Sequence, residues 1–275
     1  MVIGGGGSGG SDMGGGGGAG GYLAGTFTAA AGNYAVVVGD GGSGNNSGVG
    51  NRRGWEGGSS SLIGTNANLT AFGGGGGASN HDRGNNPAGG LNNGQTVGSG
   101  GGASGGGGNA QSNRSTDGEY GGGRRGTATA SQGKDGGVGS GFWYPAGGGG
   151  SATAGTSNPP RGGAGTLNTI LGPNFYWAAG GGGSNYSAWQ DNSGGRGGGG
   201  GGSPNNFDNR GVDGFTTASP GNGGSINSQT NVPGGNAAAN TGSGGGGGAH
   251  YSSNNYGGSG GSGIVVVRYK IGTVS

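Results

Sequence analysis

Runs of consecutive glycines limit the folding of this chain more than any other feature of its sequence. Glycine supplies 92 of the 275 residues. A glycine run has no side chain to bury, and each glycine loses about 1 to 2 kcal/mol of backbone entropy when it is fixed. An ordinary hydrophobic core is therefore excluded, and main-chain hydrogen bonds must hold the fold. The longer runs are residues 4–7, 14–18, 73–77, 105–108, 147–150, 180–183, 197–202 and 244–248.

The polyglycine II helix is the conformation that lets glycine runs bond to one another. This left-handed helix has about three residues per turn and no internal hydrogen bonds, so its N–H and C=O groups point outward. Only glycine lets neighbouring backbones approach closely enough to pair these groups. The segments between the runs are rich in Asn, Ser, Thr and Ala, which are typical of loops. We therefore predict a non-regular, all-β-like fold, a sandwich-like bundle of roughly ten polyglycine II helices joined by loops.

Two segments near the termini have the composition of β-strands. Residues 26–28 and 34–38 predict a hairpin, because aromatic and β-branched residues flank a glycine-containing turn at 29–33. Residues 264–269, with the sequence IVVVRY, form the strongest predicted strand, and residues 2–3 are placed to pair alongside it. A small sheet made by both ends would clamp the bundle and bury the few aliphatic side chains together.

The whole chain, residues 1–275, is predicted to form a single glycine-rich bundle domain. Residues 1–42 and 264–275 contribute the β clamp. No segment predicts a helix. No run approaches the roughly eighteen apolar residues that cross a bilayer, so membrane insertion is not expected.

The charged and metal-binding residues are too few and too scattered for most chemistry. The formal net charge of +2 gives no basic surface for nucleic acid. Cysteine is absent, and the two histidines, His81 and His250, lie far apart in the sequence. Glycine patterns that imitate nucleotide-binding loops arise by chance in such a chain, and Gly133-Lys134 continues to Asp135 rather than to Ser or Thr. We therefore expect no enzyme activity, no catalytic residues, no metal site and no cofactor.

Three glycine runs are preceded by aromatic residues, in the sequences LTAFGGGGG, FWYPAGGGG and NFYWAAGGGG. A ring at the entry of a glycine segment can cover the end of the bundle or lie across exposed glycine backbone. We interpret Phe72, Tyr144 and Trp177 as structural caps of this kind. Contact with a receptor is the other interpretation of the same residues.

Other aromatic residues lie in polar loops that also contain Asn, Ser and Arg. Tyr, Trp and Arg give large contact area at modest entropic cost, and Asn and Ser give adaptable hydrogen bonds, as in recognition loops. For each ring the alternative is that it covers its own loop. The receptor-binding candidates are Arg52, Arg53, Trp55, Tyr186, Trp189, Phe207, Arg210, Tyr251 and Tyr256.

Several segments also resemble a known group of proteins. They are the opening VIGGGG, the segment YAVVVGDGG at residues 34–42, the aromatic-led glycine runs and the ending GGSGGSGIVVVRY. These resemble the glycine-rich domains of tailed-bacteriophage tail-fibre proteins, over essentially the whole chain. The resemblance implies a sandwich of polyglycine II helices like that of fibre-tip adhesins, whose variable loops touch a bacterial receptor.

The residues and the resemblance together lead us to expect a structural and adhesive virion protein, a tail-fibre or receptor-binding tip component that performs no chemistry. Its expected partners are other virion proteins of the fibre or tail and a bacterial surface receptor, either an outer-membrane protein or a glycan. A homo-oligomer stays open. Its expected location is the virion surface, after assembly in the host cytoplasm.

Two alternatives stay open. One is a virion structural or decoration protein, such as a fibre-shaft connector, whose loops contact other viral subunits without binding a receptor. The other is an ice-binding protein, since such bundles present flat, regular faces. It requires evenly spaced Thr or Ala, and the sequences TATAS and SATAGT, beginning at Thr127 and Ser151, are too short to show that spacing.

Overall fold

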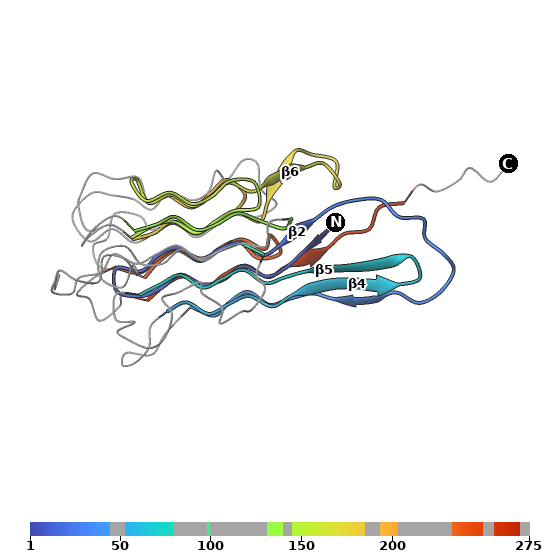
Figure 1. Cartoon of the computed structure of the whole chain (residues 1–275), viewed down its shortest axis with the longest axis horizontal. Coiled ribbons are helices and arrows are strands. Elements are labelled where there is room, and N and C mark those ends of the chain that lie inside the picture. The colour runs from blue at the N-terminus through green and yellow to red at the C-terminus, as the bar shows by residue number, and fades with distance from the viewer. Residues whose placement is uncertain are drawn as a thin grey trace.

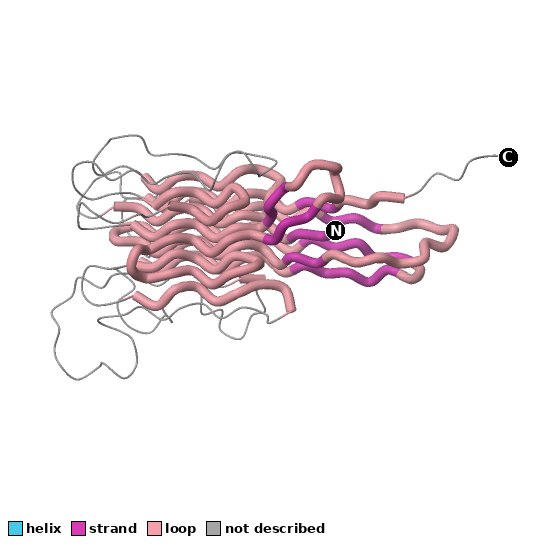
Figure 2. Tube along the Cα trace, turned by 90° about the horizontal axis from the view of Figure 1, so that it is seen from above, coloured by secondary structure: helices cyan, strands magenta, loops and turns pink. Residues whose placement is uncertain are grey.

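The computed structural model places the strands at one end of an elongated molecule and the glycine segments in the remainder (Figures 1 and 2). Among the described residues there is no helix, and the strands are short and antiparallel, so the prediction of a helix-free, β-like fold is confirmed for that part of the chain. The structure describes residues 1–44, 53–79, 98–99, 131–139, 145–184, 193–202, 233–249 and 256–269. The strands are β1 (Val2–Ile3), β2 (Tyr22–Leu23), β3 (Ala35–Val37), β4 (Ser60–Gly64), β5 (Ala67–Ala71), β6 (Thr166–Asn168), β7 (Phe175–Trp177) and β8 (Ile264–Val265).

The first sheet joins the two ends of the chain. Its order is β2-β1-β8, with Val2 opposite both Leu23 and Val265. The pairing continues by one residue, because Met1 N donates to Val266 O at 2.8 Å and Val266 N donates to Met1 O at 2.9 Å. The predicted pairing of residues 2–3 with the C-terminal strand is therefore confirmed.

The predicted hairpin of residues 26–28 with 34–38 is wrong. The strand β3 pairs instead with β4, which in turn pairs with β5, giving the order β3-β4-β5. Tyr34, the residue directly before β3, bonds through its hydroxyl to main-chain groups of two separate segments. This hydroxyl donates to Thr65 O at 2.8 Å and accepts from Ala30 N at 3.0 Å, so it ties the segment before β3 to the β4–β5 turn. The third sheet contains β6 and β7 alone.

Two small side-chain clusters pack on opposite faces of β1. Val2 and Ile3 are both fully buried, and successive residues of a strand point to opposite faces. Val2 packs with Leu62, Ala67 and Ala71 of the second sheet. Ile3 packs in the other cluster, whose buried members are Met1, Ile3, Ala19, Trp177 and Ala178.

The glycine segments are bonded to one another with a period of three residues. Within residues 4–10, every third amide donates to the same neighbouring segment. This differs from the two-residue alternation of a β-ladder. The amides of residues 5 and 8 go to segment 55–58, and those of residues 6 and 9 go to segment 258–261. The pairs toward segment 15–21, at 2.8 to 3.0 Å, are Gly4 with Gly21, Gly7 with Gly18, and Gly10 with Gly15.

The carbonyls of residues 4–10 complete a shell of backbone neighbours. They accept from Gly42 and from segments 74–77 and 245–248, so six different parts of the chain bond to this one segment. All of residues 1–21 are buried. A Cβ built on Gly6 would lie 2.0 Å from Ser243 O, a separation that no real Cβ tolerates. Close backbone contact therefore requires glycine at this position.

Candidate binding surface

The end of the bundle away from the sheets is built around the turn at residues 11–13, and we call it the turn end. This turn joins the antiparallel segments 4–10 and 14–21. Around it, Met13 N donates to Ala249 O at 3.3 Å, and Ser184 N donates to Gly14 O at 2.9 Å. Several glycine segments from distant parts of the sequence therefore meet at this turn.

These segments lead directly into regions that contain predicted binding residues. Ser184 and Ala249 are the last described residues before 185–192 and 250–255. Gly202, the last described residue before 203–232, lies beside Gly183, since a Cβ on Gly202 would fall 1.9 Å from Gly183 O. The flanks of three predicted binding regions are thus gathered at one end. The candidates Arg52, Tyr186, Trp189, Phe207, Arg210 and Tyr251 themselves lie outside the described residues.

Trp55 is a described candidate whose backbone is fixed and whose ring is exposed. Its carbonyl accepts from Ser8 N at 2.8 Å, and its amide donates to Ser8 Oγ at 2.7 Å. The side chain nevertheless remains 61% exposed. The structure therefore fixes the backbone of Trp55 and leaves its large aromatic side chain exposed.

Arg53 and Tyr256 are the other described candidates. Arg53 interacts electrostatically with Glu56: burial raises the pKa of the Glu56 carboxyl, and the attraction of Arg53 partly opposes that rise. Tyr256 is half-buried, and its carbonyl accepts from Gly234 N at 2.8 Å. Ser8 N bonds to the segment of Trp55 and the next amide bonds to Gly258 O, so the segments that carry Trp55 and Tyr256 flank the same glycine segment.

Two of the residues interpreted as caps lie where a strand passes into a glycine segment. Phe72 follows β5 directly and is half-buried, and its carbonyl accepts from Gly21 N at 2.7 Å. Trp177 ends β7 and is fully buried, and its Nε1 has no hydrogen-bond partner in the described structure. Tyr144 lies outside the described residues. The assignment of these three residues as caps stays a prediction.

Gln132 is a structural residue that sequence reasoning missed. Its Oε1 accepts from Phe72 N and its Nε2 donates to Thr70 O, both at 2.9 Å, while its own carbonyl accepts from Tyr22 N. A single buried side chain thus completes main-chain hydrogen bonds between the sheets and the glycine segments. Nothing in the surrounding sequence distinguishes this Gln from the other polar residues near it.

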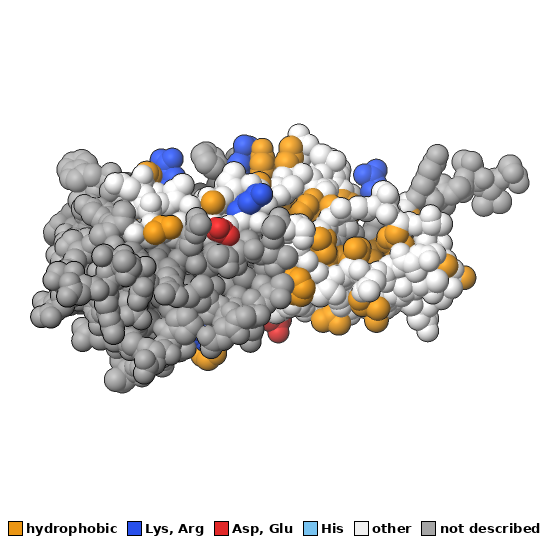
Figure 3. Space-filling view, viewed as in Figure 1, with side chains coloured by type: hydrophobic (Ala, Val, Ile, Leu, Met, Phe, Trp, Pro, Cys, Tyr) orange, Lys and Arg blue, Asp and Glu red, His pale blue; other side chains and the backbone are white. Residues whose placement is uncertain are grey.

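A second surface that sequence reasoning missed lies at the opposite end, which we call the sheet end. It comprises β1 to β8, the β4–β5 and β6–β7 connections, and the residues that directly follow β2, β3 and β8. Large apolar side chains are exposed there, and some of them form orange patches over the strands in Figure 3. The exposed large hydrophobic residues of the sheet end are Val36, Val37, Val38, Ile63, Leu167, Leu171, Val267 and Tyr269.

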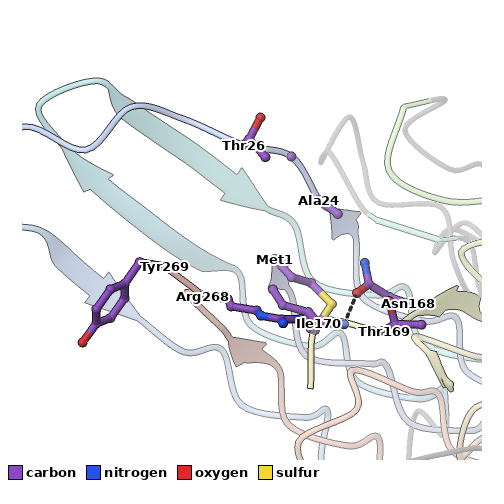
Figure 4. A pocket seen from close by; sticks show the side chains of 9 residues that line it. Met1, Ala24, Thr26, Asn168, Thr169, Ile170, Arg268 and Tyr269 are labelled. Carbon is purple, nitrogen blue, oxygen red and sulfur yellow. Dashed lines mark hydrogen bonds between the residues drawn. The ribbon is translucent and has the colours of Figure 1, made fainter. Parts of the chain in front are cut away.

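The sheet end also contains an open pocket of about 820 Å³ (Figure 4). Asn168 at its edge is held by two hydrogen bonds: its Nδ2 donates to the Tyr22 hydroxyl at 2.6 Å, and its Oδ1 accepts from Ile170 N at 2.7 Å. Burial raises the pKa of Tyr22, and the bond from Asn168 opposes that rise. Asn168 is therefore a fixed part of the wall.

The described part of the chain has exposed side chains at both ends. They contain no cluster of three or more His, Cys, Asp or Glu side chains that could hold a metal ion. They also contain no apolar helix long enough to span a lipid bilayer. Within the described residues, the arrangement provides the exposed ring of Trp55 on a hydrogen-bonded backbone and an apolar surface at the sheet end.

Comparison with known proteins gives one match. A family described as Glycine-rich domain matches residues 1–215, a range that takes in β1 to β7 and most of the glycine runs. No curated protein matches the chain, and no solved structure does. The family match covers well over half of the sequence, so the chain belongs to the glycine-rich domain family.

Proposed function

We propose that this protein is a structural and adhesive virion protein, a component of a tailed-phage tail fibre or receptor-binding tip. The observation that supports it best is the gathering, at the turn end, of the segments that flank three predicted binding regions. In this proposal, the aromatic and Arg residues of these regions are presented together at that end of the bundle. Its role is surface recognition, and it catalyses no reaction.

The bundle is, in this proposal, a polyglycine II sandwich. The three-residue hydrogen-bond period and the six neighbours around residues 4–10 are what a threefold helix with outward-pointing backbone groups would give. Backbone chemical shifts provide the test. Glycines 5–7 are expected to have φ of about −75° and ψ of about +145°. Values typical of a β-strand, with φ of about −140° and ψ of about +135°, would contradict the assignment.

This architecture suits adhesion because support and recognition use different parts of the chain. Hydrogen bonds between glycine segments fix the ends of each loop, so loop sequences can vary without unfolding the support. The partner at the turn end is a bacterial surface receptor, an outer-membrane protein or a glycan. Several modest loop contacts, repeated in a fibre on the virion surface, would add up through avidity.

Binding of the labelled, purified protein to a panel of intact bacterial strains tests the proposal. We expect saturable binding to a subset of strains. Trp55→Ala should weaken it at least about tenfold, because exposed Trp residues often dominate recognition surfaces. Stability should change by less than about 0.5 kcal/mol, since only the backbone of Trp55 is hydrogen-bonded to the bundle. Val138→Ala, at another exposed apolar residue, is the matched control.

A second variant extends the test to other loops. Trp55→Ala combined with Tyr186→Ala and Trp189→Ala should abolish cell binding, provided that thermal unfolding shows a folded protein. The adhesive role is rejected if no strain is bound, which would leave a virion decoration role, or if the folded triple variant binds like the wild type.

A further inference from the structure

The strand β3 lies at the edge of the second sheet but has the composition of a central strand. In the order β3-β4-β5, β4 pairs with one edge of β3, and no strand of the described residues pairs with the other. Residues 35–38 read AVVV, an unbroken apolar run of the kind found in strands that are covered on both faces. All four residues are exposed, and the three valines are each about half exposed. Within the described part of the chain, β3 therefore lacks the neighbours that its composition requires.

The register of the β4–β5 pair shows which way the main chain of β4 points. Two residues separate Gly64 from Ala67, so these two close the hairpin as a hydrogen-bonded pair. Along an antiparallel strand, consecutive residues direct their N–H and C=O groups alternately to one neighbouring strand and to the other. Since Gly64 bonds to β5, Ile63 and Ser61 direct their main-chain groups to β3.

The main chain of β3 alternates in the same way. The residues opposite these two, Ala35 and Val37, bond to β4. The N–H of Gly39 keeps this direction, because it donates to a serine side chain of β4 at 2.9 Å. Val36 and Val38 therefore face the open edge, each with one N–H donor and one C=O acceptor. In the described structure, Val38 makes no main-chain hydrogen bond.

We propose that β3 pairs with β3 of a second copy of this chain, in antiparallel orientation about a twofold axis at Val37. In this register, Val36 of each copy lies opposite Val38 of the other, and each of these pairs exchanges two main-chain hydrogen bonds. Both outward-facing valines of each copy thereby gain a hydrogen-bonded partner within the apolar run. The two sheets become one continuous sheet of six strands, β5-β4-β3-β3-β4-β5.

The sequence of the strand favours a second copy over a different protein. Residues 36–38 are all valine, so the strand presents the same side chains to its own copy after a twofold rotation. Natural edge strands usually carry charged residues or Pro that prevent further pairing, and residues 34–39 carry neither. The nearest charged residue, Asp40, would lie about 20 Å along the strand from its counterpart, so like charges do not meet.

The direction of β3 also suits a pair of copies. β3 enters its glycine segment at residue 39, and the strands lie at one end of the molecule (Figure 1). Antiparallel pairing therefore directs the two glycine bundles away from each other. The sheet ends would meet at the centre of an elongated dimer, and the two turn ends would lie at its far ends.

Pairing would also cover apolar side chains on both faces of β3. Val37 of one copy lies opposite Val37 of the other in a non-hydrogen-bonded pair, where side chains approach most closely. Cross-strand neighbours share a face, so Ile63, opposite Ala35, lies on the same face as Val37 and is also exposed. Val36 and Val38 meet their counterparts on the other face. Both faces thus lose apolar surface to the contact.

The inference concerns the sheet end and is independent of the adhesive role. The chain has no cysteine, so a single introduced thiol can form a disulfide only between two copies. Val37→Cys places two thiols opposite each other, with Cα atoms about 4.5 Å apart, and should give a covalent dimer on mild oxidation. Val36→Cys is the matched control, because Val36 is as exposed as Val37 but lies diagonally from its counterpart. Its Cα atoms would be about 8 Å apart, too far for a disulfide.

Sedimentation of the full chain gives an independent readout. At about 20 μM we expect the wild type to sediment with twice its chain mass of 25.2 kDa. Val37→Lys should sediment as a folded monomer, since it brings two like charges face to face. Val138→Lys, at an exposed valine outside the sheets, should stay dimeric.

Three results would overturn the proposal. They are a wild type that stays monomeric at about 100 μM, a folded Val37→Lys protein that stays dimeric, and Val36→Cys that cross-links as readily as Val37→Cys. Thermal unfolding establishes whether each variant is folded. If Val37→Lys does not fold, the two cysteine variants decide the outcome.

Discussion

The glycine segments and the sheet end achieve stability with different atoms. Around residues 4–10, six parts of the chain meet through main-chain N–H and C=O groups, and at the glycines of this segment even a methyl group has no room. At the sheet end, Val2 and Ile3 on opposite faces of β1 pack into two clusters of side chains. In the described part of this glycine-rich chain, the side-chain clusters lie at one end. Backbone hydrogen bonding must order the rest.

This difference predicts that replacing glycine with alanine has a large effect in the glycine segments and a small effect at the sheet end. Gly6→Ala should cost more than about 5 kcal/mol and prevent recovery of folded protein, because the new Cβ would collide with Ser243 O. The matched control is Gly25→Ala at the sheet end, where a Cβ would meet nothing within 4 Å. This control should fold with stability within about 1 kcal/mol of the wild type.

Thermal and urea unfolding of the two variants measure the contrast. A Gly6→Ala protein that unfolds like Gly25→Ala would show that the close backbone contact does not limit stability.

The next largest effect should come from the side-chain core. Trp177→Ala should reduce the free energy of unfolding by about 3 to 5 kcal/mol, because it removes a fully buried ring from the cluster around Ile3. Trp177→Phe should cost only about 1 to 2 kcal/mol, since Nε1 has no hydrogen-bond partner to lose in the described structure. If Trp177→Ala and Trp177→Phe lose the same free energy of unfolding in urea, the stability of this cluster does not depend on the volume of the ring.

The pairing of the chain ends could be predicted because residues 2–3 and 264–269 are the aliphatic segments nearest the termini. The partner of β3 could not, since β4 begins with serines that carry no strand signal, and the hydroxyl contact of Tyr34 is not encoded locally. The glycine segments present a related problem. Their sequences are nearly alike, so residue type predicts that they pair but not which segment pairs with which.

The candidate surfaces were predictable to a similar, limited degree. Trp55 was chosen for its polar loop, and the structure does expose its ring. The sheet-end surface was missed because the sequence predicts one small sheet in which both chain ends bury their aliphatic residues together, whereas the valines of β3 lie exposed in a second sheet.

The junction between the two regions should show an intermediate effect. Gln132→Ala should destabilise the protein by about 2 kcal/mol, because it leaves Phe72 N and Thr70 O without their side-chain partner. In this variant, the amide of Phe72 should lose more protection from hydrogen exchange than the amides within β5. If Gln132→Ala exchanges and unfolds like the wild type, this bridge does not couple the sheets to the glycine segments.

The smallest predicted effect concerns pH and Glu56. Burial raises its pKa above the ordinary value of 4.5 in the folded state, so the folded protein binds this proton more tightly than the unfolded chain. Its contribution to stability is therefore greatest below pH 4.5 and declines as the pH rises through the folded pKa. Partial exposure and Arg53 keep the effect small. As the pH rises through this range, urea unfolding should show the wild type losing stability relative to Glu56→Gln. A wild type that instead gains stability would show that the pKa of Glu56 is not raised in the folded protein.

Residue-resolved amide hydrogen exchange of the native protein tests the central claim most directly. If glycine segments order one another through their main chains, the amides of Gly7, Gly17 and Gly245 should be at least as protected as those of β1, since each donates to a neighbouring segment. Glycine amides that exchange at the rate of an unfolded chain, while β1 stays protected, would contradict it.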